Sequence, residues 1–175
     1  MNLTASPPPD GICPDDQKAA TSHHASTVSL LLLGGIIALG LSGWLGGGPG
    51  TPRQIEGDSA RLTLDVPTVV RSGDVFETRV HLVAKRSIER LVVAVEPGLW
   101  RNVTNNATLP TSGDESYERG LIRYAFGSVA AGADFRFQID HQVNPGLYGV
   151  NRGRLYVLDG EQPLVEVPLA LTVLP

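Results

Sequence analysis

From Ala60 to the end of the chain, hydrophobic and polar residues alternate with a period of two. In the cleanest stretch, Phe135, Phe137 and Ile139 are each flanked by polar residues. Successive side chains of a strand point to opposite faces, so this alternation predicts strands with one buried face. The run 91–95 is apolar throughout, which is typical of a central strand. The predicted strands cover residues 62–66, 76–82, 91–95, 122–126, 135–139, 155–157 and 165–173.

The segments between these strands carry residues that favour tight turns. Asp159 and Gly160 give the strongest hairpin signal, and a longer loop that includes Glu161 to Pro163 is the alternative. Pro168 has no N–H for a neighbouring strand, so the last strand is predicted to have an unpaired side or a bulge there. About seven short strands without any helical period predict an all-β fold, a β-sandwich over residues 60–175.

A different pattern precedes the strands. No Asp, Glu, Lys or Arg occurs in the 34 residues from Ala19 to Pro52, and residues 27–45 are almost entirely apolar. Nineteen helical residues span about 28 Å, close to the thickness of the bilayer hydrocarbon. We therefore predict one transmembrane helix over residues 26–45, with Trp44 at its edge. A secretory signal peptide and a buried core helix are the alternatives, but the positive flank and cleavage site of a signal peptide are missing.

The flanks of this helix are poor in bulky apolar residues. Residues 1–25 contain four prolines and are predicted to be a disordered tail, and residues 46–59 are predicted to be a Gly/Pro linker. One basic residue flanks each end of the helix, Lys18 before it and Arg53 after it, so the count of positive charges does not determine the orientation. A short tail followed by a helix and a folded domain is typical of a cytoplasmic N-terminus. We expect residues 53–175 on the extracytoplasmic side of the cell (inner) membrane.

Composition excludes several classes of protein. The chain has 18 acidic and 14 basic residues and a net charge of -4, whereas broad nucleic-acid binding needs a surplus of Lys and Arg. The single cysteine, Cys13, cannot form an internal disulfide. With 20 Gly and 13 Pro residues, the chain is not a helical bundle.

The histidines form no recognisable catalytic or metal-binding pattern. His141 continues the inward phase of its strand while Asp140 points to the opposite face, so the two cannot form a dyad. We expect a neutral His141 bonded to loop backbone, and His81 in solvent. His23 and His24 match no zinc spacing. No nucleophile, phosphate-loop or zinc-protease motif occurs, and we predict no catalytic residue, cofactor or metal site.

Two features are candidates for binding. The long connection 97–114 carries Leu99, Trp100 and Arg101, and Trp and Arg are enriched at interface hot spots. The alternative is that Leu99, Trp100 and Val103 fold back and cap one end of the sandwich. An exposed Trp without a partner is uncommon, so Trp100 either contacts a partner or is buried in the sandwich, and both interpretations stay open.

The second feature is a row of small residues on the predicted helix. Gly34, Ala38, Ser42 and Gly46 recur every four residues and share one face. Small side chains let membrane helices approach closely, so this face is a candidate helix–helix contact with a second copy or another membrane protein. The alternative is that small residues are simply common in membrane spans.

The strand number and spacing over residues 60–175 resemble the immunoglobulin-like and fibronectin-III-like sandwiches of bacterial membrane-anchored proteins. The Cys–Trp–Cys core of antibody domains is absent. The resemblance implies a domain that binds or assembles rather than catalyses. We expect a non-catalytic membrane protein whose sandwich contacts a protein partner, as an accessory subunit of a membrane complex. The alternatives are a ligand-binding or adhesive domain for a glycan or peptide at Trp100, and an enzyme whose site is assembled from distant residues.

Overall fold

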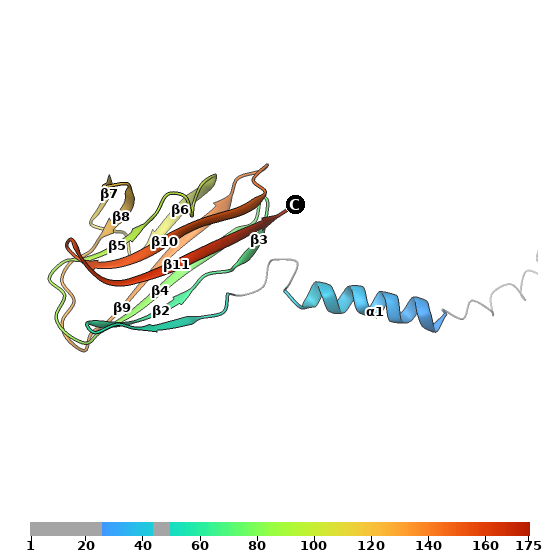
Figure 1. Ribbon diagram of the computed structural model, residues 1–175, viewed down its shortest axis with the longest axis horizontal. Coiled ribbons are helices and arrows are strands. Elements are labelled where there is room, and N and C mark those ends of the chain that lie inside the picture. Colours follow the sequence, from blue (N-terminus) through green and yellow to red (C-terminus); the bar gives the residue numbers. More distant parts are fainter. Residues whose placement is uncertain (1–25, 44–49) are drawn as a thin grey trace, which may run out of the picture. The chain divides into compact units, whose positions relative to one another are not determined.

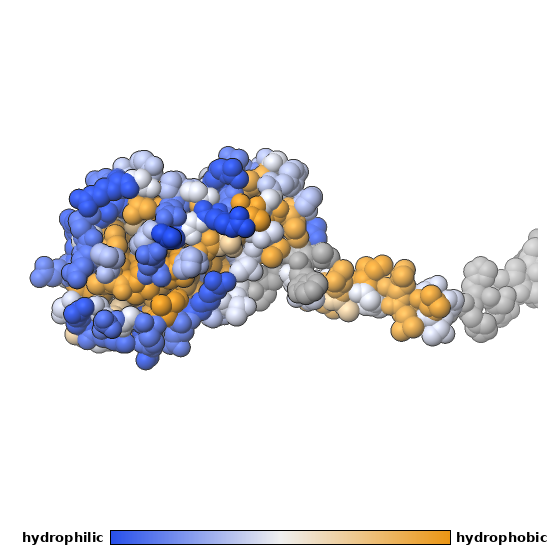
Figure 2. Space-filling model, in the orientation of Figure 1, coloured by the Kyte–Doolittle hydropathy of each residue, from blue (hydrophilic) through white to orange (hydrophobic). Residues whose placement is uncertain are grey.

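The computed structural model describes residues 26–43 and 50–175. Its helix, α1, spans Thr27–Leu41. Ser26 caps the helix, because its Oγ accepts a hydrogen bond from the N–H of Ser29 at 3.3 Å. None of the residues of α1 is buried, and hydrophobic side chains cover it along its length (Figure 2).

The helix is shorter than the predicted span of 26–45. It ends at Leu41, where the N–H of Ser42 bonds to the carbonyl of Leu39 and Gly43 adopts a left-handed φ of 72°. Its 15 residues extend about 22 Å. Within the described residues, no helix combines the length and the apolar composition that a bilayer crossing requires. The predicted tail, and residues 44–49 with Trp44 and Gly46, lie outside the described residues.

Residues 53–174 form the two sheets of a β-sandwich (Figure 1). The first sheet has five strands in the order β1 (Arg53–Glu56), β2 (Ala60–Asp65), β4 (Val75–Ala84), β9 (Asp134–Val143) and β6 (Val103–Leu109). The second has six, in the order β3 (Val69–Arg71), β11 (Gln162–Leu174), β10 (Gly149–Asp159), β5 (Leu91–Val95), β8 (Leu121–Ala125) and β7 (Asp114–Glu118). Neighbouring strands are antiparallel except β3 and β11, which are parallel.

The core lies between the inward faces of the two sheets. The predicted alternation is confirmed in β2, β4, β9 and β11, where buried residues alternate with more exposed ones over most of each strand. The apolar run of β5 has a separate cause. It is central in its sheet, between β10 and β8, and all its residues are buried. Val92 and Ala94 belong to a small second cluster with Leu158, apart from the main core.

The two predicted turn features of β10 and β11 are confirmed. Asp159 pairs with Gln162, so Gly160 and Glu161 form a two-residue hairpin turn. Pro168 pairs with β10 on one side only, since β3 reaches no further along β11 than Thr172. A missing N–H therefore costs no ladder hydrogen bond at Pro168.

Four strands were not predicted from the pattern: β1, β3, β6 and β7. β1 occupies part of the predicted linker 46–59, and β6 lies inside the predicted loop 97–114, so both predictions are wrong in those parts. All four are edge strands, since β1 and β6 end the first sheet and β3 and β7 end the second. Backbone pairing to one neighbour forms such strands, and it leaves little hydrophobic signal in the sequence.

Candidate functional site

The segment around Trp100 is packed into the sandwich. Leu99 and Trp100 are 3% and 6% exposed, which favours the capping alternative over a contact surface. Asn151 of β10 holds the turn, because its Nδ2 donates to the carbonyls of Leu99 at 3.2 Å and Arg101 at 2.8 Å. Arg101 is the exposed residue of the predicted trio. The indole of Trp100 is therefore enclosed by the core, whereas a partner contact of this loop through the exposed Arg101 stays a prediction.

Trp100 packs beside His141, which is fully buried at the end of β9. Asn105 Oδ1 lies 2.8 Å from His141 Nδ1, and Thr78 Oγ1 lies 3.0 Å from His141 Nε2. An amide oxygen can only accept, so Nδ1 carries the proton and Nε2 accepts from the hydroxyl. Burial lowers the pKa of His141 to about 4, against a smaller opposing effect of Asp140, so the imidazole is neutral at pH 7.

The hydrogen-bond chain continues to the other sheet. Asn105 Nδ2 donates to the hydroxyl of Tyr124 on β8 at 2.8 Å. Burial, and secondarily the charge of Glu115, raises the pKa of Tyr124 to about 12, so this hydroxyl stays protonated. The chain from Thr78 to Tyr124 therefore joins the two sheets through uncharged groups.

The order Thr78, His141, Asn105 has the connectivity of a nucleophile, a base and an orienting group. Access decides against that chemistry. Thr78 is 1% exposed, and the rings of Phe76 and Trp100 lie 4.7 Å and 4.6 Å from the imidazole. No substrate can reach the hydroxyl while these rings are in place. The trio acts as a satisfied polar link in the core.

The neutral His141 was predicted correctly, but its partners were not, since they are side chains rather than loop backbone. One signal for Thr78 was present in the sequence. Thr78 occupies an inward position of its strand between Phe76 and Val80, where a polar residue needs a partner. Asn105 gave no signal, because it lies on the unpredicted edge strand β6.

A hollow of about 480 Å³ lies on the outward face of the first sheet. Two cross-strand rows of side chains line it. Thr63, His81 and Arg136 are directly paired across β2, β4 and β9, and Asp65, Arg79 and Gln138 form the next row. Leu109 at the end of β6 is 58% exposed and gives the hollow one apolar wall.

Charges in and around this hollow are nearly balanced. Arg79 forms ion pairs with Asp65 at 3.5 Å and with Glu77, and Nε2 of His81 lies 2.7 Å from Asp134. His81 is thus half-buried beside a carboxylate rather than free in solvent, although its Nε2 makes no well-aligned hydrogen bond. Arg136 contacts Asp134 only through its Nε, at 3.7 Å. Donors and acceptors together suit a polar, uncharged partner surface.

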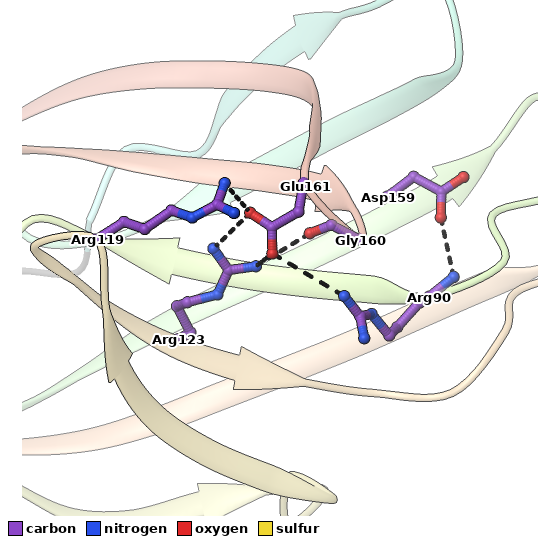
Figure 3. A network of polar contacts seen from close by, with 6 residues as sticks. All are labelled: Arg90, Arg119, Arg123, Asp159, Gly160 and Glu161. Atoms are coloured by element: carbon purple, nitrogen blue, oxygen red, sulfur yellow. Dashed lines mark hydrogen bonds and ion pairs between the residues drawn. The ribbon is translucent and has the colours of Figure 1, made fainter.

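A second polar cluster surrounds Glu161 at the tip of the β10–β11 hairpin (Figure 3). Arg123 is 5% exposed, and its guanidinium bonds to both carboxylate oxygens of Glu161 at 2.9 and 3.3 Å and to the carbonyl of Gly160 at 3.0 Å. Arg119 Nη1 lies 2.8 Å from Glu161, and Arg90 approaches it at 4.0 Å. These contacts tie the β7–β8 hairpin to the β10–β11 turn. The cluster is a structural clamp.

Two of the four small residues predicted to form a helix contact, Gly34 and Ala38, lie on α1. Ser42 follows the helix directly, and Gly46 lies outside the described residues. The contact therefore stays a prediction. No group of histidine, cysteine and carboxylate side chains among the described residues is placed to hold a metal ion.

No protein-family model matches the chain, and no curated protein does. The fold is similar to that of the chitin-binding domain of a hyperthermophilic chitinase from Pyrococcus furiosus, at 18% identity and a TM-score of 0.40, over 67% of this chain and 100% of that one. It is similar also to a CARDB domain from Pyrococcus furiosus, at 16% identity and a TM-score of 0.41, over 70% and 95%. The two packed sheets show a β-sandwich, and the comparisons assign no family to it.

Proposed function

We propose that this protein is a non-catalytic binding protein anchored in the cell (inner) membrane by its hydrophobic segment. Its tail lies in the cytoplasm, and its β-sandwich contacts a protein partner on the extracytoplasmic side, as an accessory subunit of a membrane complex. The lipid bilayer and another membrane protein, or a second copy of the chain, are its partners.

The exposed apolar surface of α1 carries this proposal. Its large apolar side chains, Val28, Leu30, Leu31, Leu32, Leu33, Ile36, Ile37, Leu39 and Leu41, are between 45% and 83% exposed. Apolar surface costs about 25 cal/mol per Å² in water, so a helix that is apolar on every side is stabilised by lipid or by another apolar helix. The apolar sequence continues to Leu45, and a bilayer can thin around a short helix.

The sandwich supports binding rather than reaction. Its one constellation with catalytic connectivity, Thr78 with His141 and Asn105, is sealed in the core of the described domain. The hollow on the first sheet instead offers paired charges, an amide and an apolar wall to a partner. Arg136, which has the weakest internal partner of these groups, is the side chain that a partner engages first.

The hollow also favours a second candidate function, a ligand-binding domain for a glycan or a peptide. Its side chains include both donors and acceptors, as recognition of hydroxyl or amide groups requires. In this alternative the ligand lies on the first sheet near Leu109, and not at the buried Trp100.

Carbonate washing of native membranes, followed by purification of the intact chain in mild detergent, tests the proposal. We expect the chain in the washed membrane fraction and a partner that co-purifies with it. The variant Arg136→Ala should lose the partner. The matched control Arg154→Ala, an exposed arginine on the outward face of the second sheet, should keep it.

Recovery of the chain in the soluble fraction would contradict membrane anchoring. Recovery as a monomer without a partner would contradict the accessory role. Binding of an oligosaccharide or a peptide by that monomer, lost in Arg136→Ala, would establish the second candidate function.

A further inference from the structure

A second hollow, of about 500 Å³, lies where the first residue of β1 approaches the outward side of β10 and β11. Its polar lining consists of two arginines and two threonines, and its other wall is apolar. The lining residues that matter are Arg53, Thr68, Arg152, Pro168, Ala170 and Thr172.

The charge of this hollow is one-sided. Arg53 and Arg152 line it, no acidic residue does, and neither arginine forms an ion pair with a carboxylate of the described residues. Arg154, two positions further along β10, shows the contrast, because its Nε lies 3.2 Å from Glu166. The hollow on the first sheet shows the same contrast, because its arginines, Arg79 and Arg136, form ion pairs with carboxylates.

The backbone around the hollow is fixed by sheet pairing. The N–H of Thr172 donates to the carbonyl of Thr68 at 2.8 Å, and β3 continues in parallel register from that point. Arg152 is paired with Ala170 across β10 and β11. Sheet pairing therefore fixes the backbone positions of Thr68, Thr172 and Arg152. Arg53 approaches from the edge of the other sheet.

We propose that this hollow binds a phosphate group. A guanidinium offers a planar fork of N–H donors that matches an oxyanion, and threonine hydroxyls donate to its remaining oxygens. Two arginines in a lining that holds no carboxylate favour an anion over the neutral partner that suits the first hollow.

The short sequence distance between Arg53 and the hydrophobic segment favours an anionic phospholipid headgroup as the source of this phosphate group. Arg53 follows Leu45, the last apolar residue of the hydrophobic segment, by eight residues, a reach of at most about 29 Å. Basic residues this close to an anionic membrane surface gain about 1 kcal/mol each. This choice of source rests on the proposed membrane anchoring, whereas the affinity for phosphate does not.

Amide chemical shifts of the full chain in neutral detergent test the phosphate site. Titration with inorganic phosphate should shift the amides of Arg152 and Thr172 to saturation, and sodium chloride at equal ionic strength should not. Arg53→Gln and Arg152→Gln should each weaken phosphate binding about fivefold. The matched control Arg154→Gln should bind as the unaltered chain does.

The same amides, followed in nanodiscs of phosphatidylcholine with and without phosphatidylglycerol, test the lipid source. Shifts that require phosphatidylglycerol and vanish in Arg152→Gln would support a headgroup. Shifts with free phosphate alone would overturn the lipid source. Equal shifts with chloride, or none with either probe, would overturn the site itself. If phosphate binds but carbonate extracts the chain from membranes, the anchoring fails and the phosphate site stands.

Discussion

The indole of Trp100 packs against the imidazole of His141, with ring centroids 4.6 Å apart. Phe76 stacks on the same imidazole at 4.7 Å, so aromatic rings enclose a side chain whose two nitrogens already have neutral partners. Burial in this surrounding outweighs the weaker stabilisation that the charge of Asp140 gives to an added proton. The same packing that removes Trp100 from the surface therefore keeps His141 uncharged.

The first prediction is that acid destabilises the fold through His141. Its pKa in the folded chain is about 4, below the ordinary value of 6.5, so between these values the unfolded chain binds a proton that the folded chain does not. The stabilisation is complete above pH 6.5 and is lost as the pH falls to about 4, a change of about 3 kcal/mol in the free energy of unfolding. Urea unfolding at a series of pH values measures it.

The control for this experiment is His141→Gln, which removes the titrating group and keeps a polar side chain. The variant should be less stable at neutral pH and should lose most of the decline between pH 6.5 and 4. An equally steep decline in the variant would show that carboxylates, and not His141, cause it.

The second prediction concerns the partner of His141 Nδ1. Asn105→Asp places a carboxylate where the amide oxygen now accepts, 2.8 Å from the ring, and a nearby negative charge favours the imidazolium. The pKa of His141 should therefore rise well above 4, as NMR titration of the ring proton would show. Asn106→Asp, one residue away at the register shift of β6, is the matched control and should leave the pKa of His141 nearly unchanged. Equal shifts in both variants would contradict the proposed contact.

Strands with one buried face were predictable from sequence because burial imposes a period of two. Phe137 and Ile139 on β9 are 2% and 0% exposed, in the predicted phase. β1 and β6 were not predictable, because pairing to one neighbour fixes a strand without a hydrophobic pattern. The candidate site shared this limit, since Asn105 lies on β6 and the first hollow is lined by side chains from four strands.

The place of Trp100 shows a second limit. Residue type was compatible with both an exposed anchor and a core residue. The position of Asn151 on β10 decides between them, because its side chain bonds to the carbonyls on both sides of Trp100 and holds the turn inward. These hydrogen bonds join Asn151 to residues about fifty positions away in the sequence, and no local sequence pattern predicts them.

The third prediction concerns the clamp at Glu161. Glu161→Ala removes both carboxylate oxygens from the buried guanidinium of Arg123 and leaves it the carbonyl of Gly160. A buried cation that loses its charged partner should lower the free energy of unfolding by about 2 kcal/mol. Glu166→Ala on β11 is the matched control, because its partner Arg154 is 54% exposed, and the denaturation midpoint of this variant should not change measurably. Equal losses in the two variants would contradict the clamp.

The last prediction tests the close approach of β10 to the turn that carries Trp100. A Cβ on Gly153 would lie 2.9 Å from Leu99 Cβ and 3.0 Å from its backbone N, closer than side-chain carbons pack. Backbone cannot move aside as a flexible side chain can, so Gly153→Ala should lower the free energy of unfolding by about 1–3 kcal/mol. It should also raise the solvent exposure of Trp100, seen as a red shift and stronger quenching of its fluorescence in a Trp44→Phe background. Gly127→Ala is the matched control, because a Cβ there meets nothing within 4 Å, and the same change should be neutral or slightly stabilising. If Gly153→Ala is as stable as the control, the turn is free to move, and the buried position of Trp100 does not depend on this contact.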